Sequence, residues 1–305
     1  MNLIKILTII SFFFTEIIAQ VPIYTFPIET VNYYVNGGNG VQIYVEEKGD
    51  PKKTTILFTS GHLSSRLSWN PQWYDPNLYE RFHLVRWDYR GVGRSDKPKD
   101  VNSYSIESNA KDLFVVVTKI KSNNPNKKIV TIGWSIGTQS TLTFMKNNPD
   151  IKIDGFISIV GFVNANFMPK ITVEFGKILM ALADPLDNFS TIIYGINGTM
   201  AYRTFKPMSD QYRAFRFGEA VLVAPEYRKS KVNPSDLTDF FSSLSIPTLN
   251  IIGEKDAVVL LEHSLYFASL AKNGEKIIYK DVGHSPPWEE KSITNDIARF
   301  VSKFN

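Results

Sequence analysis

The chain has 305 residues, and its 43% of hydrophobic and 21% of charged residues are ordinary for a globular protein with a substantial core. Its net charge is only +4, and no long run of Lys or Arg occurs, so we expect no nucleic-acid partner. Cysteine is absent, which excludes a disulfide framework, a thiol nucleophile and a thiolate metal site.

The first residues have the order of a secretory signal peptide. Lys5 precedes a short apolar run at residues 6–14, and Ala19 offers a small residue for cleavage. Glu16 interrupts the apolar stretch, which is therefore shorter than the ~20 apolar residues of a bilayer span. We predict a signal peptide at residues 1–19 and a secreted protein with no stable membrane span after cleavage. The alternative is an uncleaved signal anchor that tethers the protein to a membrane.

Along the mature chain, β-rich runs alternate with segments whose apolar residues recur at helical spacing. Strands are predicted at residues 31–35, 41–46, 54–59, 82–87, 128–132, 153–160, 247–252 and 276–282. Helices are predicted at residues 105–122, 136–146, 262–271 and 289–304. A glycine-rich turn joins the first two strands as a hairpin, whereas the later alternation requires parallel strands. The fold class is therefore α/β, with a doubly wound, mostly parallel sheet of about eight strands.

A segment of different character interrupts this core at residues 162–246. Helices are predicted there at residues 171–183, 210–222 and 234–244, and the breaks between them at Pro185, Gly195, Gly198, Pro207 and Pro225. A helical insertion at this point can close over the strand ends where α/β sheets bind ligands. We therefore predict a core domain at residues 20–161 and 247–305 and a helical lid at 162–246. The alternative is that the insertion only adds a layer to the core.

The segment Gly133-Trp134-Ser135-Ile136-Gly137 matches the pattern G-x-S-x-G between a predicted strand and a predicted helix. A serine at so sharp a turn has a strained backbone and presents its Oγ above the sheet. Glycines are needed beside it because a Cβ there would collide with the adjacent strand or helix. This setting predicts Ser135 as a catalytic nucleophile.

A serine nucleophile needs a base, and the base needs an acid that orients it. His284 directly follows a predicted strand, in a loop whose glycine and two prolines disfavour a helix. His83 and His263 fall inside a predicted strand and a predicted helix, where packed or solvated imidazoles are usual. Asp256 follows another predicted strand and is the predicted acid, with Glu254 as the competing carboxylate. The resulting order of serine, acid and histidine is the one associated with this motif.

Two backbone N–H groups should stabilise the oxyanion of acyl transfer. The N–H of Ile136 opens the helix after the nucleophile and is the first candidate. His62 lies in the loop after the third predicted strand, and its N–H is the second candidate. Its imidazole is expected to line the pocket or to lie exposed, and a role as the base is the less favoured alternative.

Several segments resemble the α/β-hydrolase superfamily, in its esterase-like branch (AB hydrolase-1 type) with a helical lid, over residues 31–304. They are, in chain order, Ser60-Gly61-His62, Arg66-Leu67-Ser68-Trp69, residues 86–98, 133–137 and 253–256, and Gly283-His284-Ser285-Pro286. Ser60 stands where relatives usually carry histidine, so the oxyanion loop is expected to be held differently. Thr138 stands where a third glycine is common, which should tighten the packing of the turn.

The resemblance implies a serine hydrolase that needs no metal or organic cofactor. An acyl-enzyme on Ser135 would cleave the carboxylic ester, or thioester, of a small and largely apolar substrate. One alternative is a cofactor-free peroxidase or perhydrolase, which makes peracids with the same three residues. The other is a ligand-binding receptor of the same fold.

Substrate contacts are predicted for Trp134 and for apolar residues of the lid, although much of a stripe at helical spacing is ordinary packing. The lid residues are Phe167, Met168 and Leu179, with Phe175, Ile178 and Met180 in the same stripe. Glu174 and Glu219 are possible lid carboxylates for a substrate amine, but their spacing does not single them out.

Overall fold

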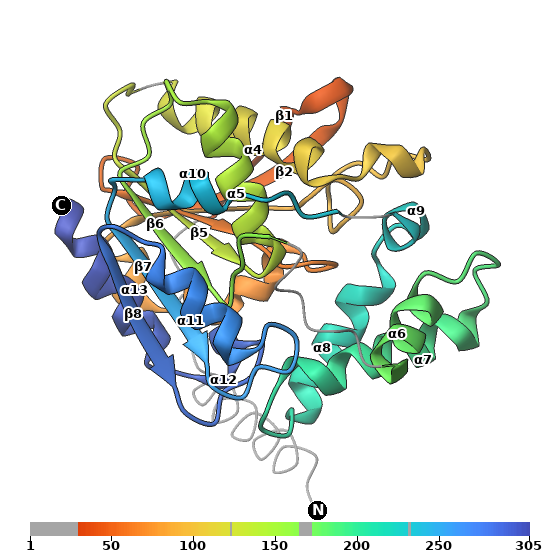
Figure 1. Ribbon diagram of the computed structural model, residues 1–305. Coiled ribbons are helices and arrows are strands. Elements are labelled where there is room, and N and C mark those ends of the chain that lie inside the picture. The colour runs from red at the N-terminus through yellow and green to blue at the C-terminus, as the bar shows by residue number, and fades with distance from the viewer. Residues whose placement is uncertain (1–29, 123, 165–172, 231–232) are drawn as a thin grey trace, which may run out of the picture.

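The computed structural model describes residues 30–122, 124–164, 173–230 and 233–305, and within them eight strands form one sheet (Figure 1). The strand order is β1-β2-β4-β3-β5-β6-β7-β8. Strand β2 is antiparallel to β1 and β4, and the other neighbouring pairs are parallel. The strands are β1 (Val31–Asn36), β2 (Gln42–Lys48), β3 (Thr55–Thr59), β4 (His83–Trp87), β5 (Ile129–Trp134), β6 (Gly155–Ile159), β7 (Thr248–Gly253) and β8 (Gly274–Tyr279). The predicted mostly parallel sheet with an opening hairpin is confirmed, whereas the predicted signal peptide at residues 1–19 lies outside the described residues.

Helices cover both faces of the sheet, because successive side chains of a strand point to opposite faces. In β3, Leu57 packs into one apolar cluster with residues of α4 (Ile106–Lys121) and α5 (Ile136–Asn147). The next residue, Phe58, packs into a second cluster with residues of α13 (Ile293–Val301). This arrangement brings the carboxyl ends of the parallel strands to one edge of the sheet, where ligands bind in such folds.

Between β6 and β7 the chain forms the helical insertion, whose helices α6 to α9 gather at one side of the sheet, on the right of Figure 1. Its helices are α6 (Val173–Leu182), α7 (Phe189–Arg203), α8 (Asp210–Val221), α9 (Pro225–Lys229) and α10 (Thr238–Ser243). Helices α6 and α8 match the predicted ones, whereas α10 is shorter than the predicted helix at residues 234–244. Helices α7 and α9 are not predicted from the sequence.

Helix α7 corrects the prediction that Gly195 and Gly198 break the insertion into shorter pieces. A Cβ at Gly195 would lie 2.5 Å from the backbone nitrogen of Leu182, and a Cβ at Gly198 would lie 2.6 Å from Cγ1 of Ile178. Both contacts are shorter than real Cβ contacts allow. The glycines therefore let α7 approach α6 closely, and they do not end a helix.

The C-terminal segment also differs from the prediction of one helix at residues 289–304. The structure has α12 (Pro286–Glu289), then α13, then a 3₁₀ turn at Ser302–Phe304. The prolines of the preceding loop occupy the first positions of α12, where a missing N–H costs no helical hydrogen bond. Helix α11 (Leu261–Ser269) joins β7 to β8 as predicted, and the short helices α2 (Asn70–Trp73) and α3 (Pro76–Tyr79) precede β4.

Among the helices of the described residues, none combines the length and the apolar character needed to cross a membrane.

Candidate active site

Ser135 stands at the turn between β5 and α5, with φ 54° and ψ −120°. A positive φ is unfavourable for a residue with a Cβ and persists only where its surroundings enforce it. The N–H of Ser135 donates to the carbonyl oxygen of Ile159 at 2.9 Å, and its carbonyl accepts from the N–H of Thr138 at 2.9 Å. The strained conformation expected for this serine is thus present and is held on both sides by backbone hydrogen bonds.

The glycines beside Ser135 are required by backbone contacts. A Cβ at Gly137 would lie 2.6 Å from the carbonyl oxygen of Ser60, and a Cβ at Gly133 would lie 2.7 Å from Cα of Thr138. Thr138 itself donates its hydroxyl to the carbonyl oxygen of Gly133 at 3.1 Å. The threonine in place of a third glycine therefore ties the start of α5 to the end of β5.

The structure brings Ser135, His284 and Asp256 together in a chain of hydrogen bonds. Nε2 of His284 lies 2.9 Å from Oγ of Ser135, and Nδ1 of His284 lies 2.8 Å from Oδ2 of Asp256. Oδ1 of Asp256 accepts the N–H groups of Val258 at 2.7 Å and of Val259 at 2.9 Å, which fix the carboxylate. Because a carboxylate can only accept, Nδ1 carries the imidazole proton and Nε2 is free to accept the serine proton. All three side chains are buried.

The loop that carries His284 is held from both sides. The indole of Trp134 donates to the carbonyl oxygen of His284 at 2.9 Å. Oε1 of Glu289 accepts the N–H groups of Gly283 at 3.0 Å and of Ser285 at 3.1 Å. These contacts set the position of the imidazole without using either of its nitrogens.

The competing residues considered from the sequence have other partners. Glu254 pairs with Lys255 at 3.3 Å. Nδ1 of His83 lies 3.0 Å from the hydroxyl of Thr55, and Nε2 lies 3.1 Å from Glu47. His263 lies on α11, away from the chain of hydrogen bonds at Ser135.

The loop after β3 lies beside Ser135, as predicted for the oxyanion loop. A Cβ at Gly61 would lie 3.7 Å from Cβ of Ser135, and both His62 and Ile136 line the same cavity as the serine. Within the described part of the chain, the N–H groups of His62 and Ile136 have no protein acceptor. Burial, with a smaller effect of the Arg203 charge, lowers the pKa of the His62 imidazole to about 4. His62 is therefore neutral near pH 7, and it lines the pocket without reaching the serine hydroxyl as a base.

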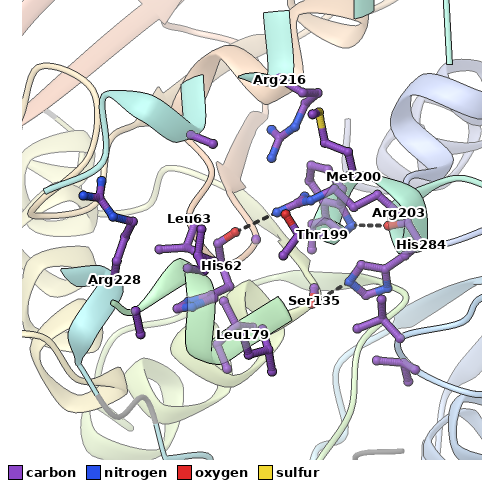
Figure 2. A pocket seen from close by; sticks show the side chains of 18 of the residues that line it. His62, Leu63, Ser135, Leu179, Thr199, Met200, Arg203, Arg216, Arg228 and His284 are labelled. Atoms are coloured by element: carbon purple, nitrogen blue, oxygen red, sulfur yellow. Dashed lines mark hydrogen bonds between the residues drawn. The ribbon is translucent and has the colours of Figure 1, made fainter. Parts of the chain in front are cut away.

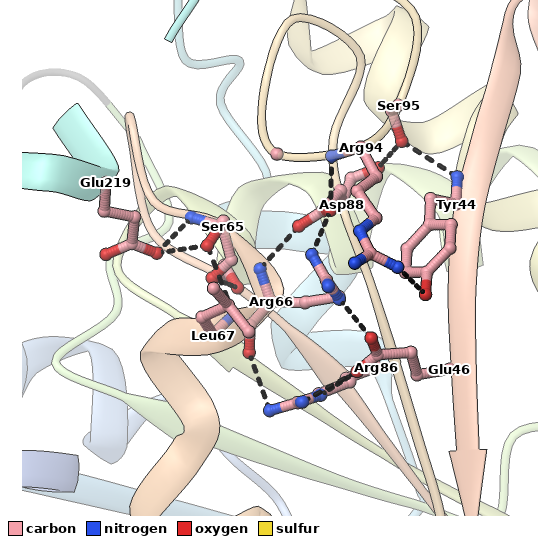
Figure 3. A network of polar contacts seen from close by, with 12 residues as sticks. Tyr44, Glu46, Ser65, Arg66, Leu67, Arg86, Asp88, Arg94, Ser95 and Glu219 are labelled. Atoms are coloured by element: carbon pink, nitrogen blue, oxygen red, sulfur yellow. Dashed lines mark hydrogen bonds and ion pairs between the residues drawn. The ribbon is translucent and has the colours of Figure 1, made fainter. Parts of the chain in front are cut away.

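Buried polar contacts fix the oxyanion loop to the core (Figure 3). Ser60, which stands where relatives usually carry histidine, donates its hydroxyl to the carbonyl oxygen of Ser65 at 3.0 Å, a contact inside the loop. Arg66 pairs with Glu46 at 2.8 Å and with Asp88 at 2.6 Å. Asp88 also accepts the N–H of Arg66 at 2.8 Å. The segment of residues 86–98 therefore serves to hold this loop.

The helical insertion holds the same loop from the other side. Glu219 of α8 accepts the N–H of Ser65 at 2.6 Å and the hydroxyl of Ser68 at 2.9 Å (Figure 3). Arg216 forms an ion pair with Glu219 and donates to the hydroxyls of Ser68 at 2.6 Å and Ser64 at 3.1 Å. Glu219 is thus a buried structural carboxylate. The other candidate for binding a substrate amine, Glu174, accepts from the hydroxyl of Tyr194 at 2.9 Å, and neither carboxylate lines the cavity at Ser135.

A cavity of about 330 Å³ lies between the core and the helical insertion, with Ser135 and His284 in its wall (Figure 2). This volume is near the lower end of ligand pockets. Most of the wall is apolar and comes from both parts of the chain. Its apolar residues are Leu63, Trp134, Ile136, Phe162, Leu179, Leu182, Ala183, Met200, Ala220, Pro234, Val258 and Val259.

Some of the residues predicted to contact substrate line the cavity, and others do not or lie outside the described residues. Trp134 and Leu179 line the cavity, and their contact with a substrate stays a prediction. Phe167 and Met168 lie outside the described residues, as does the side chain of Phe175. Two further residues of the apolar stripe do not reach the cavity, because Met180 is 76% exposed and Ile178 packs on Gly198.

Three arginines of the insertion also line the cavity, and the sequence did not indicate them. They are Arg203, Arg216 and Arg228. Arg203 and Arg228 lie on α7 and α9, which are not predicted from the sequence, and Arg216 lies on the predicted helix at residues 210–222 without a pattern that singles it out. No group of three or more metal-ligating side chains occurs among the residues described.

Comparison with known proteins matches residues 54–291 to the family model described as "alpha/beta hydrolase fold". A protein of Mycobacterium tuberculosis (strain ATCC 25618 / H37Rv), "Probable oxidoreductase EphD", is 30% identical over 127 residues, which are 42% of this chain and 21% of that protein. The match thus spans about a fifth of that relative's length.

Two further similar proteins match along most of their lengths. The "Bifunctional esterase/perhydrolase DCH" of Acinetobacter calcoaceticus is 25% identical over 288 residues, or 88% of this chain and 99% of that protein. A solved structure, a "putative aryl esterase" from Burkholderia cenocepacia, superposes with a TM-score of 0.79 at 25% identity, covering 90% of this chain and 98% of that one.

Proposed function

This chain belongs to the α/β-hydrolase fold family, and we propose that it is a serine esterase in which Ser135 is the nucleophile, His284 the base and Asp256 the orienting acid. One observation carries the proposal: the hydrogen-bonded chain from Asp256 through His284 to Ser135 ends at a mostly apolar cavity. Similarity to proteins named as esterases supports the same reaction class.

In the proposed reaction, Oγ of Ser135 attacks the carbonyl carbon of an ester while Nε2 of His284 takes its proton. The imidazolium then protonates the leaving alkoxide, the alcohol departs, and an acyl-enzyme remains on Ser135. A water molecule attacks the acyl carbon as His284 again accepts a proton, and the acid is released. Asp256 stabilises the imidazolium through its hydrogen bond to Nδ1.

The N–H groups of Ile136 and His62 would stabilise the negative oxygen of the tetrahedral intermediates. Both residues line the cavity with Ser135, and both N–H groups lack a protein acceptor among the described residues. The loop of His62 is fixed by the core and by the insertion, so these donors need no reorganisation during the reaction. We propose that the insertion acts as a lid, since its residues close one wall of the cavity and leave room for a small acyl or alcohol group.

The test is to react the purified protein with a fluorophosphonate and to offer it short p-nitrophenyl esters. We expect label on Ser135 and ester turnover, and the loss of both in Ser135→Ala. A folded sample that shows neither label nor turnover would contradict the enzyme function and favour a ligand-binding receptor. Turnover that survives Ser135→Ala would instead contradict the assignment of the nucleophile.

A perhydrolase activity is the second candidate, favoured by similarity to the bifunctional enzyme of Acinetobacter calcoaceticus. The same acyl-enzyme, formed from a carboxylic acid with loss of water, would be cleaved by hydrogen peroxide to give a peracid. A peroxide-dependent assay run beside the ester assay separates the two, because an esterase without this activity gives no peracid above background.

We further propose that the protein enters the secretory route. The charged start, short apolar run and small residue at Ala19 support cleavage at that position. Mass spectrometry of the mature N-terminus checks this, since an uncleaved anchor would leave residues 1–19 in place.

A further inference from the structure

The wall of the cavity at Ser135 includes one charged side chain, that of Arg203, for which the described residues provide no carboxylate partner. Arg203, the last residue of α7, lines the cavity together with Ser135 and His284 (Figure 2). Its Nη2 donates to the carbonyl oxygen of His62 at 3.1 Å. No Asp or Glu pairs with it in the described part of the chain. One carbonyl engages one of the five N–H donors that a guanidinium carries.

The other two arginines of the wall have carboxylate partners. Arg216 is buried and paired with Glu219, and it donates to two serine hydroxyls. Arg228 donates to the carbonyl oxygen of Val223 at 2.6 Å and lies 3.9 Å from Asp187. Arg203 therefore differs from its neighbours in having no carboxylate partner, although it belongs to the same pocket wall.

The stretches of the insertion that are not described do not supply a missing acid. Residues 165–172 and 231–232 contain no Asp and no Glu in the sequence. The carboxylate of Asp256 is engaged by His284 and by two backbone N–H groups. Since no Asp or Glu is among the described residues that line the cavity, the wall itself carries the positive charge of its arginines.

Placing an unpaired charge in such surroundings is costly, and proteins usually provide a partner for it. Burial and the nearby charge of Arg216 lower the pKa of Arg203 to about 9, which reflects that cost. An anionic ligand that paired with Arg203 would offset the cost of this unpaired charge. The planar fork of a guanidinium matches the two oxygens of a carboxylate, with which it can form two parallel N–H···O hydrogen bonds.

Building on the proposed esterase function, we propose that Arg203 binds a free carboxylate of the substrate, and that the preferred ester is a small one bearing such a group. The cavity volume of about 330 Å³ places this carboxylate and the scissile ester in one compact molecule. Most of the molecule between them would be apolar, in keeping with the rest of the wall.

A matched pair of esters tests the proposal. Mono-p-nitrophenyl adipate carries a free carboxylate, and methyl p-nitrophenyl adipate is its neutral counterpart; buffer rates are subtracted for both. We expect kcat/KM for the anionic ester to exceed that for the neutral one by about tenfold or more, the size of one charge-assisted hydrogen-bonded pair. Arg203→Gln should reduce this ratio to about one, and Arg203→Lys should retain part of it.

The control is Arg213→Gln, the same chemical change at an exposed position of α8, which should keep the wild-type ratio. If Arg203 only held the carbonyl of His62, Arg203→Gln would lower kcat/KM for both esters by the same factor and leave their ratio unchanged. That result, or a wild-type enzyme that prefers the neutral ester, would overturn the proposal while the esterase function stands.

Calorimetry on Ser135→Ala protein tests the same point without turnover. Monomethyl adipate should bind more tightly than dimethyl adipate, and Arg203→Gln in the same background should remove the difference. Equal binding of the two compounds would contradict the role of Arg203. The outcome is thus separate from any failure of label or turnover, which bears on the proposed function alone.

Discussion

Two regions meet at the cavity, and the polar groups Asp256 and Arg203 that they place beside it differ in how many partners they have. On the core side, the strained turn at Ser135 is held by backbone hydrogen bonds, and the carboxylate of Asp256 has three donors. On the side of the insertion, Arg203 has one hydrogen-bond partner among the described residues, the carbonyl oxygen of His62. A polar side chain whose hydrogen-bond partners all belong to the protein has the same environment whichever substrate is bound. A charged side chain with few partners is stabilised most by a ligand that supplies the missing ones. In the proposed enzyme, the core would therefore carry out the reaction and the insertion would select the substrate.

The largest expected effect concerns the core side. In Asp256→Asn, the amide oxygen would keep the N–H bonds of Val258 and Val259, and the amide NH₂ would face Nδ1 of His284. The imidazole proton would then move to Nε2, which could no longer accept the serine proton. We expect kcat for a p-nitrophenyl ester to fall by about 10³- to 10⁴-fold.

The control for this prediction is Glu254→Gln, which changes the neighbouring carboxylate that pairs with Lys255. It should stay within about threefold of wild type, because a surface carboxylate away from the imidazole contributes little. A larger loss in Glu254→Gln than in Asp256→Asn would reverse the assignment of the acid.

The next prediction compares the environments of Arg216, which is buried, and Arg203, which is partly buried, by stability. Glu219→Ala leaves Arg216 buried without its carboxylate and should lower the free energy of unfolding by about 3–5 kcal/mol. Arg203→Met removes a charge that has no carboxylate partner, so stability should change by less than about 1 kcal/mol or rise. Urea unfolding monitored by tryptophan fluorescence measures both. Comparable losses in the two variants would show that Arg203 is paired in the free protein.

A smaller effect on stability should distinguish a glycine whose Cβ would collide with its neighbours from a glycine with open space around it. A Cβ at Gly133 would lie 2.7 Å from backbone atoms of Gly137 and Thr138, so Gly133→Ala should cost at least about 2 kcal/mol. Gly218 lies within α8 with nothing within 4 Å of its Cβ position, so Gly218→Ala should stabilise the protein by up to about 1 kcal/mol. Thermal unfolding of the two variants gives the comparison, and equal shifts would contradict it.

The same contrast explains what the sequence could and could not predict. Ser135, Asp256 and His284 each lie within five residues of the end of a strand, and a strand with its following loop is a local pattern. The position of Arg203 depends on α7, which is not predicted from the sequence because Gly195 and Gly198 are typical of helix breaks. Those glycines serve a contact with α6, a tertiary feature that no local pattern records.

The smallest predicted effect joins the two regions through His62. Its pKa is lowered to about 4 chiefly by burial and further by the Arg203 charge. In the unfolded chain the pKa of His62 would be near 6.5. Between about pH 6.5 and pH 4 the unfolded chain therefore binds a proton at this residue and the folded protein does not. This site therefore leaves the protein fully stable above about pH 6.5 and costs stability progressively as pH falls toward 4.

Removing the Arg203 charge should move the His62 midpoint upward without restoring its ordinary value, because burial is the larger cause. With only four histidines, proton NMR of the imidazole C–H signals can follow this shift in Arg203→Met, and His62→Gln identifies the signal. The acid-side loss of stability should shrink in the same variant. An unchanged midpoint would mean that the guanidinium is already neutralised in the free protein, and the contrast between the two regions would then fail at the residue on which it rests.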